Sequence, residues 1–133
     1  MASSPGHLID LMATCVDVGG ATYPAEHNGN QITPLEGKSL APVFETGSRE
    51  EHSGIYWEHE GNRAVRQDNW KLVSRWNKED GGQWELYDLK ADRTEMNDLA
   101  SSNPTKVAEL TTMYDTWSTR AKVVPWKSWE KQA

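Results

Sequence analysis

Cysteine is almost absent from the sequence, since Cys15 is the only one in 133 residues. A single thiol excludes an intramolecular disulfide and leaves no second thiolate for a zinc or iron–sulfur cluster. The cysteine count therefore does not indicate a redox compartment, because it provides neither a disulfide framework nor a multi-thiol metal site.

Long apolar runs and an excess of positive charge are also lacking. No stretch approaches the roughly 18 to 20 apolar residues that span a bilayer, so we predict no transmembrane segment. The 20 acidic and 14 basic residues give a net charge of −6, whose field repels phosphate backbones, and we expect no nucleic-acid partner. Residues 1–7 are small and polar rather than charged and then apolar, so no signal peptide is predicted in this chain and its localisation is unassigned.

Phenylalanine occurs once, whereas tryptophan occurs seven times. Large rings bury much area, so this balance argues against disorder and predicts one folded core. Sugar stacking on exposed rings is the functional alternative. We place four of the tryptophans in strands of the core, namely Trp57, Trp70, Trp76 and Trp84. Trp126 and Trp129 lie in the tail and are expected to cover a neighbouring surface.

The first 53 residues combine a helix with a long irregular connection. Apolar residues recur at spacings of three and four, which predicts a helix over about 6–19. They are Leu8, Leu11, Met12, Cys15 and Val16, and the opposite face carries His7, Asp10 and Asp17. Residues 21–54 show no sustained period, and we predict a loop with a short turn at 37–40. Loops of this length are uncommon unless they cover a larger body.

From residue 54 the pattern changes to strict alternation. It predicts an antiparallel meander of four strands, over about 54–60, 63–67, 69–76 and 83–88, with short turns between them. Asn103 is a favourable N-cap and Pro104 a favourable first residue for a helix that continues to about 122. The predicted class is α+β: a four-stranded antiparallel sheet packed by a C-terminal helix, plus the N-terminal helix and the long irregular loop.

No catalytic or metal-binding pattern stands out among the polar residues. A G-x-S-x-G nucleophile elbow is absent, and Gly37-Lys38-Ser39 lacks the upstream glycine of a phosphate-binding loop. The acidic and histidine residues in 50–52 and 58–60 do not follow a known metal-ligand spacing, and we interpret them as solvated positions. We therefore assign no catalytic residue and no metal ligand.

One hairpin carries a candidate binding site. Two guanidinium groups and an imidazole, Arg63, Arg66 and His59, stand close together in the sequence beside a tight turn. Such groups can hold an anionic oxygen by charge-assisted hydrogen bonds, which makes these three residues candidates for substrate binding. The structural alternative is a surface ion pair across the hairpin between Arg63 and Glu58.

Six short blocks carry a resemblance to a known family. They are Pro5–Thr14, Gly37–Leu40, Tyr56–Arg66, Trp70–Val73, Trp84–Leu89 and, in two pieces, Asp92–Glu95 with Asn97–Leu99. In this order they resemble the C-terminal part of a formylglycine-dependent arylsulfatase of the bacterial type, in the sulfatase family. The resemblance extends over nearly the whole chain. It implies the C-terminal subdomain of an alkaline-phosphatase-like fold, in which an antiparallel sheet packs against a long helix.

The sequence also departs from that family. Sulfatases convert the Cys or Ser of a C-x-P-x-R-type segment to formylglycine, whereas Cys15 is followed by Val16-Asp17-Val18-Gly19. The calcium-binding aspartates and the catalytic lysines and histidines of the family lie upstream of the matching part. The resemblance therefore implies no cofactor in this chain, with calcium and formylglycine expected in a full-length parent. We predict that the chain alone is inactive as a sulfuric ester hydrolase.

Three functional hypotheses follow. The first is a C-terminal sulfatase fragment, from a truncated gene, a split reading frame or an engineered piece. The second is a non-catalytic module that binds sulfated glycan or another anion. The third is a structural partner that docks on a separate catalytic chain. Under the first hypothesis, residues 1–53 are a remnant of the large sulfatase domain, residues 54–122 form the C-terminal sheet-and-helix subdomain, and residues 123–133 are a tail.

The apolar stripe of the first helix predicts a contact with another surface. No sheet in the predicted fold is available to cover it, so its large side chains would be exposed. We expect either self-association or contact with a missing N-terminal sulfatase domain.

Overall fold

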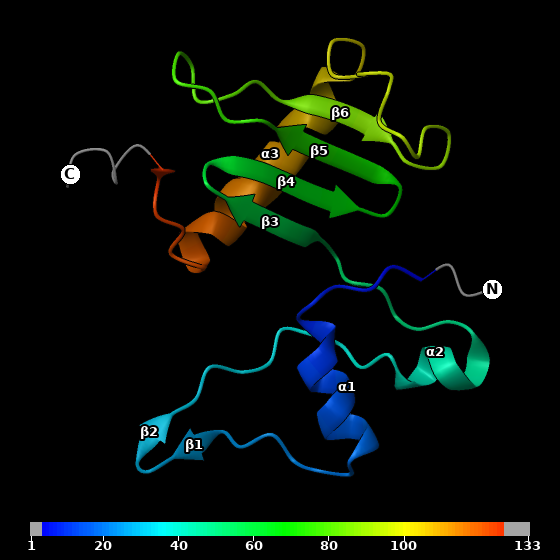
Figure 1. The fold of residues 1–133 in the computed structure, drawn as a ribbon, viewed down its shortest axis with the longest axis vertical. Helices are drawn as coiled ribbons and strands as arrows, with labels where there is room; N and C mark the ends of the chain where they lie inside the picture. Colours follow the sequence, from blue (N-terminus) through cyan, green and yellow to red (C-terminus); the bar gives the residue numbers. More distant parts are fainter. Residues whose placement is uncertain (1–3, 127–133) are drawn as a thin grey trace. The chain divides into compact units, whose positions relative to one another are not determined.

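The computed structural model describes residues 4–126 (Figure 1). Tertiary contacts divide the chain into two units, the first ending at His52 and the second beginning at Ser53. Over the described residues, none of the helices combines the length and the apolar character that crossing a membrane requires.

The first unit contains two helices and a small ribbon. Helix α1 spans Asp10–Val18, strands β1 and β2 span Glu26–His27 and Asn30–Gln31, and helix α2 spans Ala41–Thr46. The predicted helix over about 6–19 is thus shorter than expected. Its first residues form a turn instead, because the N–H of His7 donates to the Asp10 carboxylate at 2.9 Å.

The long loop predicted after α1 is more ordered than its sequence indicates. β1 and β2 pair antiparallel around Asn28 and Gly29, whose φ angles of 50° and 76° suit a tight two-residue turn. In place of a turn at 37–40, α2 begins at Ala41 and ends before Gly47, which has a φ of 83°. Strands of two residues and a helix of six are too short to establish a period in the sequence.

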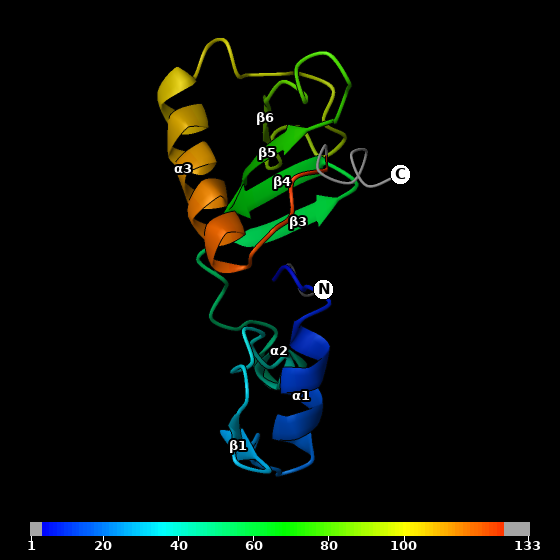
Figure 2. The same ribbon diagram turned by 90° about the vertical axis from the view of Figure 1, so that its left-hand side faces the viewer.

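The second unit contains the predicted meander. Strands β3 (Ile55–His59), β4 (Asn62–Gln67), β5 (Trp70–Ser74) and β6 (Glu85–Asp88) form one antiparallel sheet in chain order, which confirms the predicted fold class. The first turn consists of Glu60 and Gly61, with φ angles of 52° and 80°, one residue earlier than predicted. Helix α3, Pro104–Arg120, covers one face of the sheet (Figure 2).

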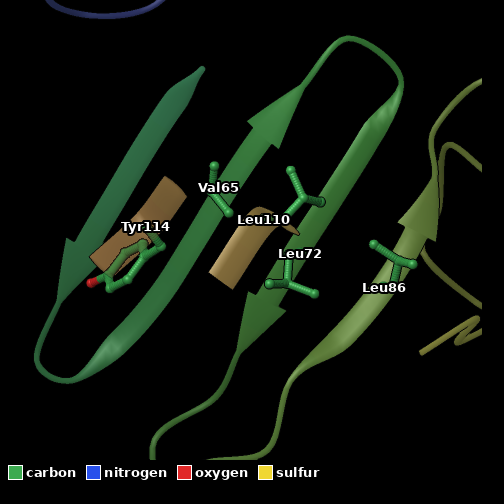
Figure 3. Packing of buried hydrophobic residues seen from close by; sticks show 5 residues of the cluster. All are labelled: Val65, Leu72, Leu86, Leu110 and Tyr114. Carbon is green, nitrogen blue, oxygen red and sulfur yellow. The ribbon is translucent and has the colours of Figure 1, made fainter. Parts of the chain in front are cut away.

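The core lies between α3 and that face of the sheet (Figure 3). It is built from one or two side chains of each contributing element, namely Val65, Leu72, Leu86, Leu110 and Tyr114. Alternation explains the set, because Val65 and Leu72 face each other in the β4–β5 register, as do Leu72 and Leu86 in the β5–β6 register.

The tryptophan placements need a correction. Trp57 and Trp70 lie within strands, whereas Trp76 and Trp84 fall just outside β5 and β6, because the connection between those strands is longer than predicted. Trp70 and Trp84 nevertheless pack against the core. Trp126 and Trp76 flank the β3–β4 turn, since a Cβ placed on Gly61 would lie 3.1 Å from Trp126 Cβ and 2.5 Å from Trp76 Cδ1. Trp129 lies outside the described residues.

Candidate functional site

The β3–β4 hairpin positions the three residues predicted to bind substrate. In its register Glu58 faces Arg63, His59 faces Asn62 and Ile55 faces Arg66. Because side chains alternate between the two faces of a strand, Arg63 lies on the same face of the sheet as Val65, which is the face that α3 covers. His59 and Arg66 lie on the opposite face, which α3 does not cover and which we call the open face, although Ile55 on it is buried.

The Arg63 guanidinium is held inside the second unit. Its Nη2 donates to Ser74 Oγ at 3.0 Å and to the carbonyl of Gly82 at 3.3 Å. The group also lies 4.5 Å from the centroid of the Trp84 ring, a cation–π contact. Arg63 therefore ties β4 to β5 and to the connection before β6. Glu58, expected as its ion-pair partner, lies opposite it but accepts from the N–H of Gly61 at 2.9 Å.

His59 and Arg66 share the open face but lie toward opposite ends of the hairpin. Their register partners, Asn62 and Ile55, place them about four residues apart along the strands, or roughly 13 Å. Arg66 Nε donates to the carbonyl of Asp68 at 3.0 Å. The structure thus does not gather the three predicted residues around one point, and only His59 and Arg66 face the same side.

Among the described residues, the most enclosed charged side chain lies on the polar face of α1, which the sequence pattern predicts to be exposed. Asp10, at the start of α1, is fully buried. Its Oδ2 accepts from the N–H of His7 at 2.9 Å and from Arg49 Nη2 at 2.7 Å. Its Oδ1 accepts from the N–H of Lys38 at 2.9 Å and lies 2.7 Å from His52 Nε2. We call Asp10, Arg49 and His52 the Asp10 cluster.

The Asp10 cluster links three parts of the first unit. Arg49 also donates to the carbonyls of Lys38 and Pro5, at 2.6 and 2.7 Å. One turn further along α1, Thr14 Oγ1 accepts from the N–H of Leu40 at 2.9 Å. The polar side of α1 is therefore the side that faces the rest of the unit. A sequence spacing of 39 and 42 residues from Asp10 to its two side-chain partners leaves no local signal that could have identified them.

The hydrogen bonds of Asp10 also determine its charge. Burial by itself raises the pKa of the Asp10 carboxyl, but the bonds from Arg49, from the N–H groups of Lys38 and His7, and from His52 outweigh that effect. The pKa is held well below its ordinary value, so the group is a carboxylate at neutral pH.

The residues present do not fit the calcium and formylglycine that the resemblance implies for a full-length parent. Both Asp10 oxygens are occupied by donors and lie against a guanidinium, whereas calcium takes six to eight oxygen ligands. Within residues 4–126 no group of three or more His, Cys, Asp or Glu side chains is placed to hold a metal ion. Cys15 is an exposed residue of α1. The Asp10 cluster is best described as a buried ion-pair and hydrogen-bond network that links parts of the first unit.

A family model described as "N-sulphoglucosamine sulphohydrolase, C-terminal" matches residues 7–118. An N-acetylglucosamine-6-O-sulfatase of Bacteroides thetaiotaomicron is 32% identical over 95 residues, covering 68% of this chain and 17% of the relative. A sulfatase of Formosa agariphila is 29% identical over 115 residues, covering 75% of this chain and 20% of the relative. An uncharacterized sulfatase of Schizosaccharomyces pombe is 27% identical over 106 residues, covering 77% and 19%.

Solved structures show the same fold. One, in complex with its substrate D-glucosamine-2-N,6-O-disulfate, has a TM-score of 0.60 at 25% identity and covers 85% of this chain and 24% of its own. Another, Ps i-CgsB, has a TM-score of 0.62 at 24% identity and covers 87% and 25%. The chain thus spans about a fifth of the length of the curated relatives it matches and about a quarter of these solved chains.

Proposed function

The chain belongs to the sulfatase family, in its C-terminal N-sulphoglucosamine sulphohydrolase domain, and from this premise we propose that it serves as the C-terminal part of a sulfuric ester hydrolase. The match to residues 7–118 carries the proposal, because it includes α1, all four strands of the main sheet and most of α3. The sheet-and-helix unit is the C-terminal subdomain of an alkaline-phosphatase-like sulfatase fold.

The finer proposal is that the parent enzyme is a formylglycine-dependent arylsulfatase of the bacterial type. The ordered blocks of the sequence support it, in particular Tyr56–Arg66 and Trp84–Leu89. The name of one curated relative and the description of one solved structure both give a glucosamine sulfate derivative as the substrate. A sulfated sugar is therefore the substrate class to test beside an aryl sulfate.

We expect the polypeptide of residues 1–133 to release no phenol from an aryl sulfate, even with calcium present. Sulfate ester cleavage requires a nucleophile, a group that binds the sulfate oxygens and a proton donor for the leaving alcohol. The Asp10 carboxylate is occupied by its donors, and Cys15 lacks the context of a formylglycine precursor. The measurement is phenol absorbance against a blank without protein, and release above the blank would contradict the proposal.

The open face of the β3–β4 hairpin is the proposed contribution of this chain to substrate binding. His59 and Arg66 lie on that face, and Trp57 between them is partly exposed, so a sugar ring and its sulfate could both find partners there. The proposed role of Arg63 is indirect. Its guanidinium bonds to Ser74 and Gly82, so it supports the loop before β6 rather than contacting the substrate.

Arg66→Ala is expected to weaken binding of a sulfated monosaccharide about tenfold, the value of one charge-assisted hydrogen bond, without changing the melting temperature. Arg63→Ala is expected to lower the melting temperature as well, since it leaves the loop before β6 unsupported. Arg93→Ala, on an exposed loop of the same unit, is the matched control. Calorimetric titration checks the affinities, and equal binding by the Arg66 and Arg93 variants would rule the open face out.

A further inference from the structure

Strands β1 and β2 are joined by an Asn-Gly pair, a feature that the proposed function leaves unused (Figure 1). A two-residue turn of this kind needs a positive φ at both positions, and Asn28 and Gly29 have φ angles of 50° and 76°. Asparagine and glycine adopt this conformation more readily than other residues. The turn alone therefore accounts for the pair, and any further property of it must come from its chemistry.

The chemistry concerns the side-chain amide of Asn28. Its carbon, Cγ, is an electrophile, and the backbone nitrogen of the next residue can attack it to close a cyclic imide. A side chain on that next residue obstructs the approach, whereas glycine has none. Of the seven asparagines in the sequence, Asn28 is the one that precedes a glycine.

Little in the fold holds this turn closed. Residues 19–31 are all exposed, and each strand of the ribbon is two residues long. No apolar core supports the ribbon, because the buried hydrophobic side chains within residues 4–126 all belong to the second unit. An isolated two-stranded ribbon is marginally stable in water, so we expect the turn to open at little cost in free energy.

The Asn28 amide is also free to rotate, unlike most of the other asparagine side chains. Among the described residues, the bond that another side chain makes to Asn28 goes to its backbone carbonyl, from Asn30 Nδ2 at 3.2 Å. By contrast, Asn62 Nδ2 donates to the carbonyl of His59 at 2.9 Å. Asn77 Oδ1 accepts from the N–H of Glu79 at 2.9 Å. Such bonds hold an amide away from the next backbone nitrogen.

Asp80 is the other Asn or Asp residue that precedes a glycine, and its surroundings are different. The N–H of Gly81, which would have to attack, donates to the carbonyl of Asn77 at 3.2 Å. The Asp80 carboxylate accepts from the N–H of Gly82 and from Gln83 Nε2, both at 2.7 Å. A carboxylate is a poorer electrophile than an amide, so the fold leaves Asn28 as the reactive position.

We propose that Asn28–Gly29 is a site of spontaneous deamidation, a modification that needs water but no enzyme. The Gly29 nitrogen bonds to Asn28 Cγ, the Cγ–Nδ2 bond breaks, and the proton of the Gly29 N–H leaves with the amide group as ammonia. Water then adds to one of the two imide carbonyls. Addition at Cγ gives aspartate in an ordinary backbone, whereas addition at the backbone carbonyl of Asn28 gives isoaspartate.

Both products change the end of the ribbon. The chain gains one negative charge beyond its net charge of −6. Isoaspartate also inserts a methylene group into the backbone, so the pairing of His27 with Asn30 is lost. Because the N–H of Ile32 donates to the carbonyl of Ala25 across the ribbon, we expect that N–H to exchange faster after conversion.

The test is incubation of the full chain at neutral and at alkaline pH, followed by trypsin digestion and mass spectrometry. Asn28 falls in the tryptic peptide 1–38. Asn69, which is exposed in the β4–β5 turn but precedes Trp70, falls in the peptide 67–71 and is the internal control. Replacement of the amide nitrogen by oxygen raises the mass of a peptide, and fragmentation assigns the change to Asn28 or Asn30.

We expect conversion at Asn28 to be at least about tenfold faster than at Asn69, which corresponds to a barrier lower by about 1.4 kcal/mol. Alkaline pH is expected to accelerate it, because the attacking nitrogen must lose its proton. Gly29→Ala adds a methyl group where the structure has open space and is expected to slow conversion about tenfold. Asn28→Gln keeps an amide but requires a larger ring, and is expected to abolish conversion at position 28.

The same incubation in urea gives the rate for the unfolded chain. Because the turn is exposed and weakly held, the folded chain is expected to convert within about tenfold of that rate. A larger difference would show that the turn protects Asn28 and would overturn the proposal. Equal conversion at Asn28 and Asn69, or an unchanged rate in Gly29→Ala, would overturn it as well.

Discussion

Asp10→Asn is expected to lower the free energy of unfolding of the first unit by about 3–5 kcal/mol, the range for breaking a buried ion pair by removing one partner. The substitution keeps the shape of the side chain but leaves the Arg49 guanidinium, which is 2% exposed, without its counter-charge. Because the described part of the first unit has no buried apolar side chain, little else compensates for the loss. Hydrogen exchange at the Lys38 and His7 amides measures the effect, since both donate to Asp10.

Asp17→Asn is the matched control, because Asp17 lies on the same helix and is exposed. It is expected to change stability by less than about 0.5 kcal/mol. Equal exchange rates in the Asp10 and Asp17 variants would show that the Asp10 cluster does not hold the unit together.

The Asp10 cluster also predicts a pH dependence with a definite sign. The carboxyl pKa is lower in the folded protein than its unfolded value of about 3.9. A lowered folded pKa gives stabilisation that is fully present above the unfolded value and is lost as the pH falls through the folded value. The difference in stability between wild type and Asp10→Asn is therefore expected to shrink below about pH 4. A difference that stays constant between pH 7 and pH 3 would contradict this assignment.

Leu72→Ala is expected to destabilise the second unit by about 2–5 kcal/mol. Leu72 is fully buried at the centre of the sheet, where its register neighbours Val65 and Leu86 and the α3 residue Leu110 are fully buried too. Truncation removes the transfer free energy of the lost methyl groups and leaves a cavity that the surrounding strands cannot fill. Urea denaturation followed by tryptophan fluorescence measures it, because Trp70 and Trp84 pack against this core.

Met96→Ala is the control for the core prediction. Met96 belongs to the same unit but is largely exposed, so its truncation removes little buried area. A shift for Leu72→Ala as small as that for Met96→Ala would mean that the core lies elsewhere. Neither substitution touches the Asp10 cluster, and hydrogen exchange at the Lys38 amide is expected to stay unchanged in both.

The second unit could be predicted closely because its signals are local. Alternation over each strand, short turn sequences and the Asn103–Pro104 start of α3 are all readable within a few residues, and the sheet and helix follow them. Even there, the positions of Trp76 and Trp84 were wrong by one or two residues at strand ends. Strand ends depend on pairing with a neighbour, which a single strand's pattern does not contain.

The candidate binding residues were only partly predictable. The sequence places His59, Arg63 and Arg66 beside one turn, and alternation in the observed register then separates Arg63 from the other two. The contacts of Arg63 with Ser74 and Gly82 join residues 11 and 19 positions away, which proximity in sequence does not indicate.

The sequence by itself determined the α+β class, the order of the four strands, the long final helix and the sulfatase family, because these depend on local periodicity and on ordered blocks of residues. Only the tertiary structure decided the orientation of α1. The pattern of apolar residues showed that the helix has two faces, but the polar face is the one turned inward, because Arg49 and His52 return from far along the chain to meet Asp10. A buried carboxylate is stable only with such partners, and they come together only when the chain folds.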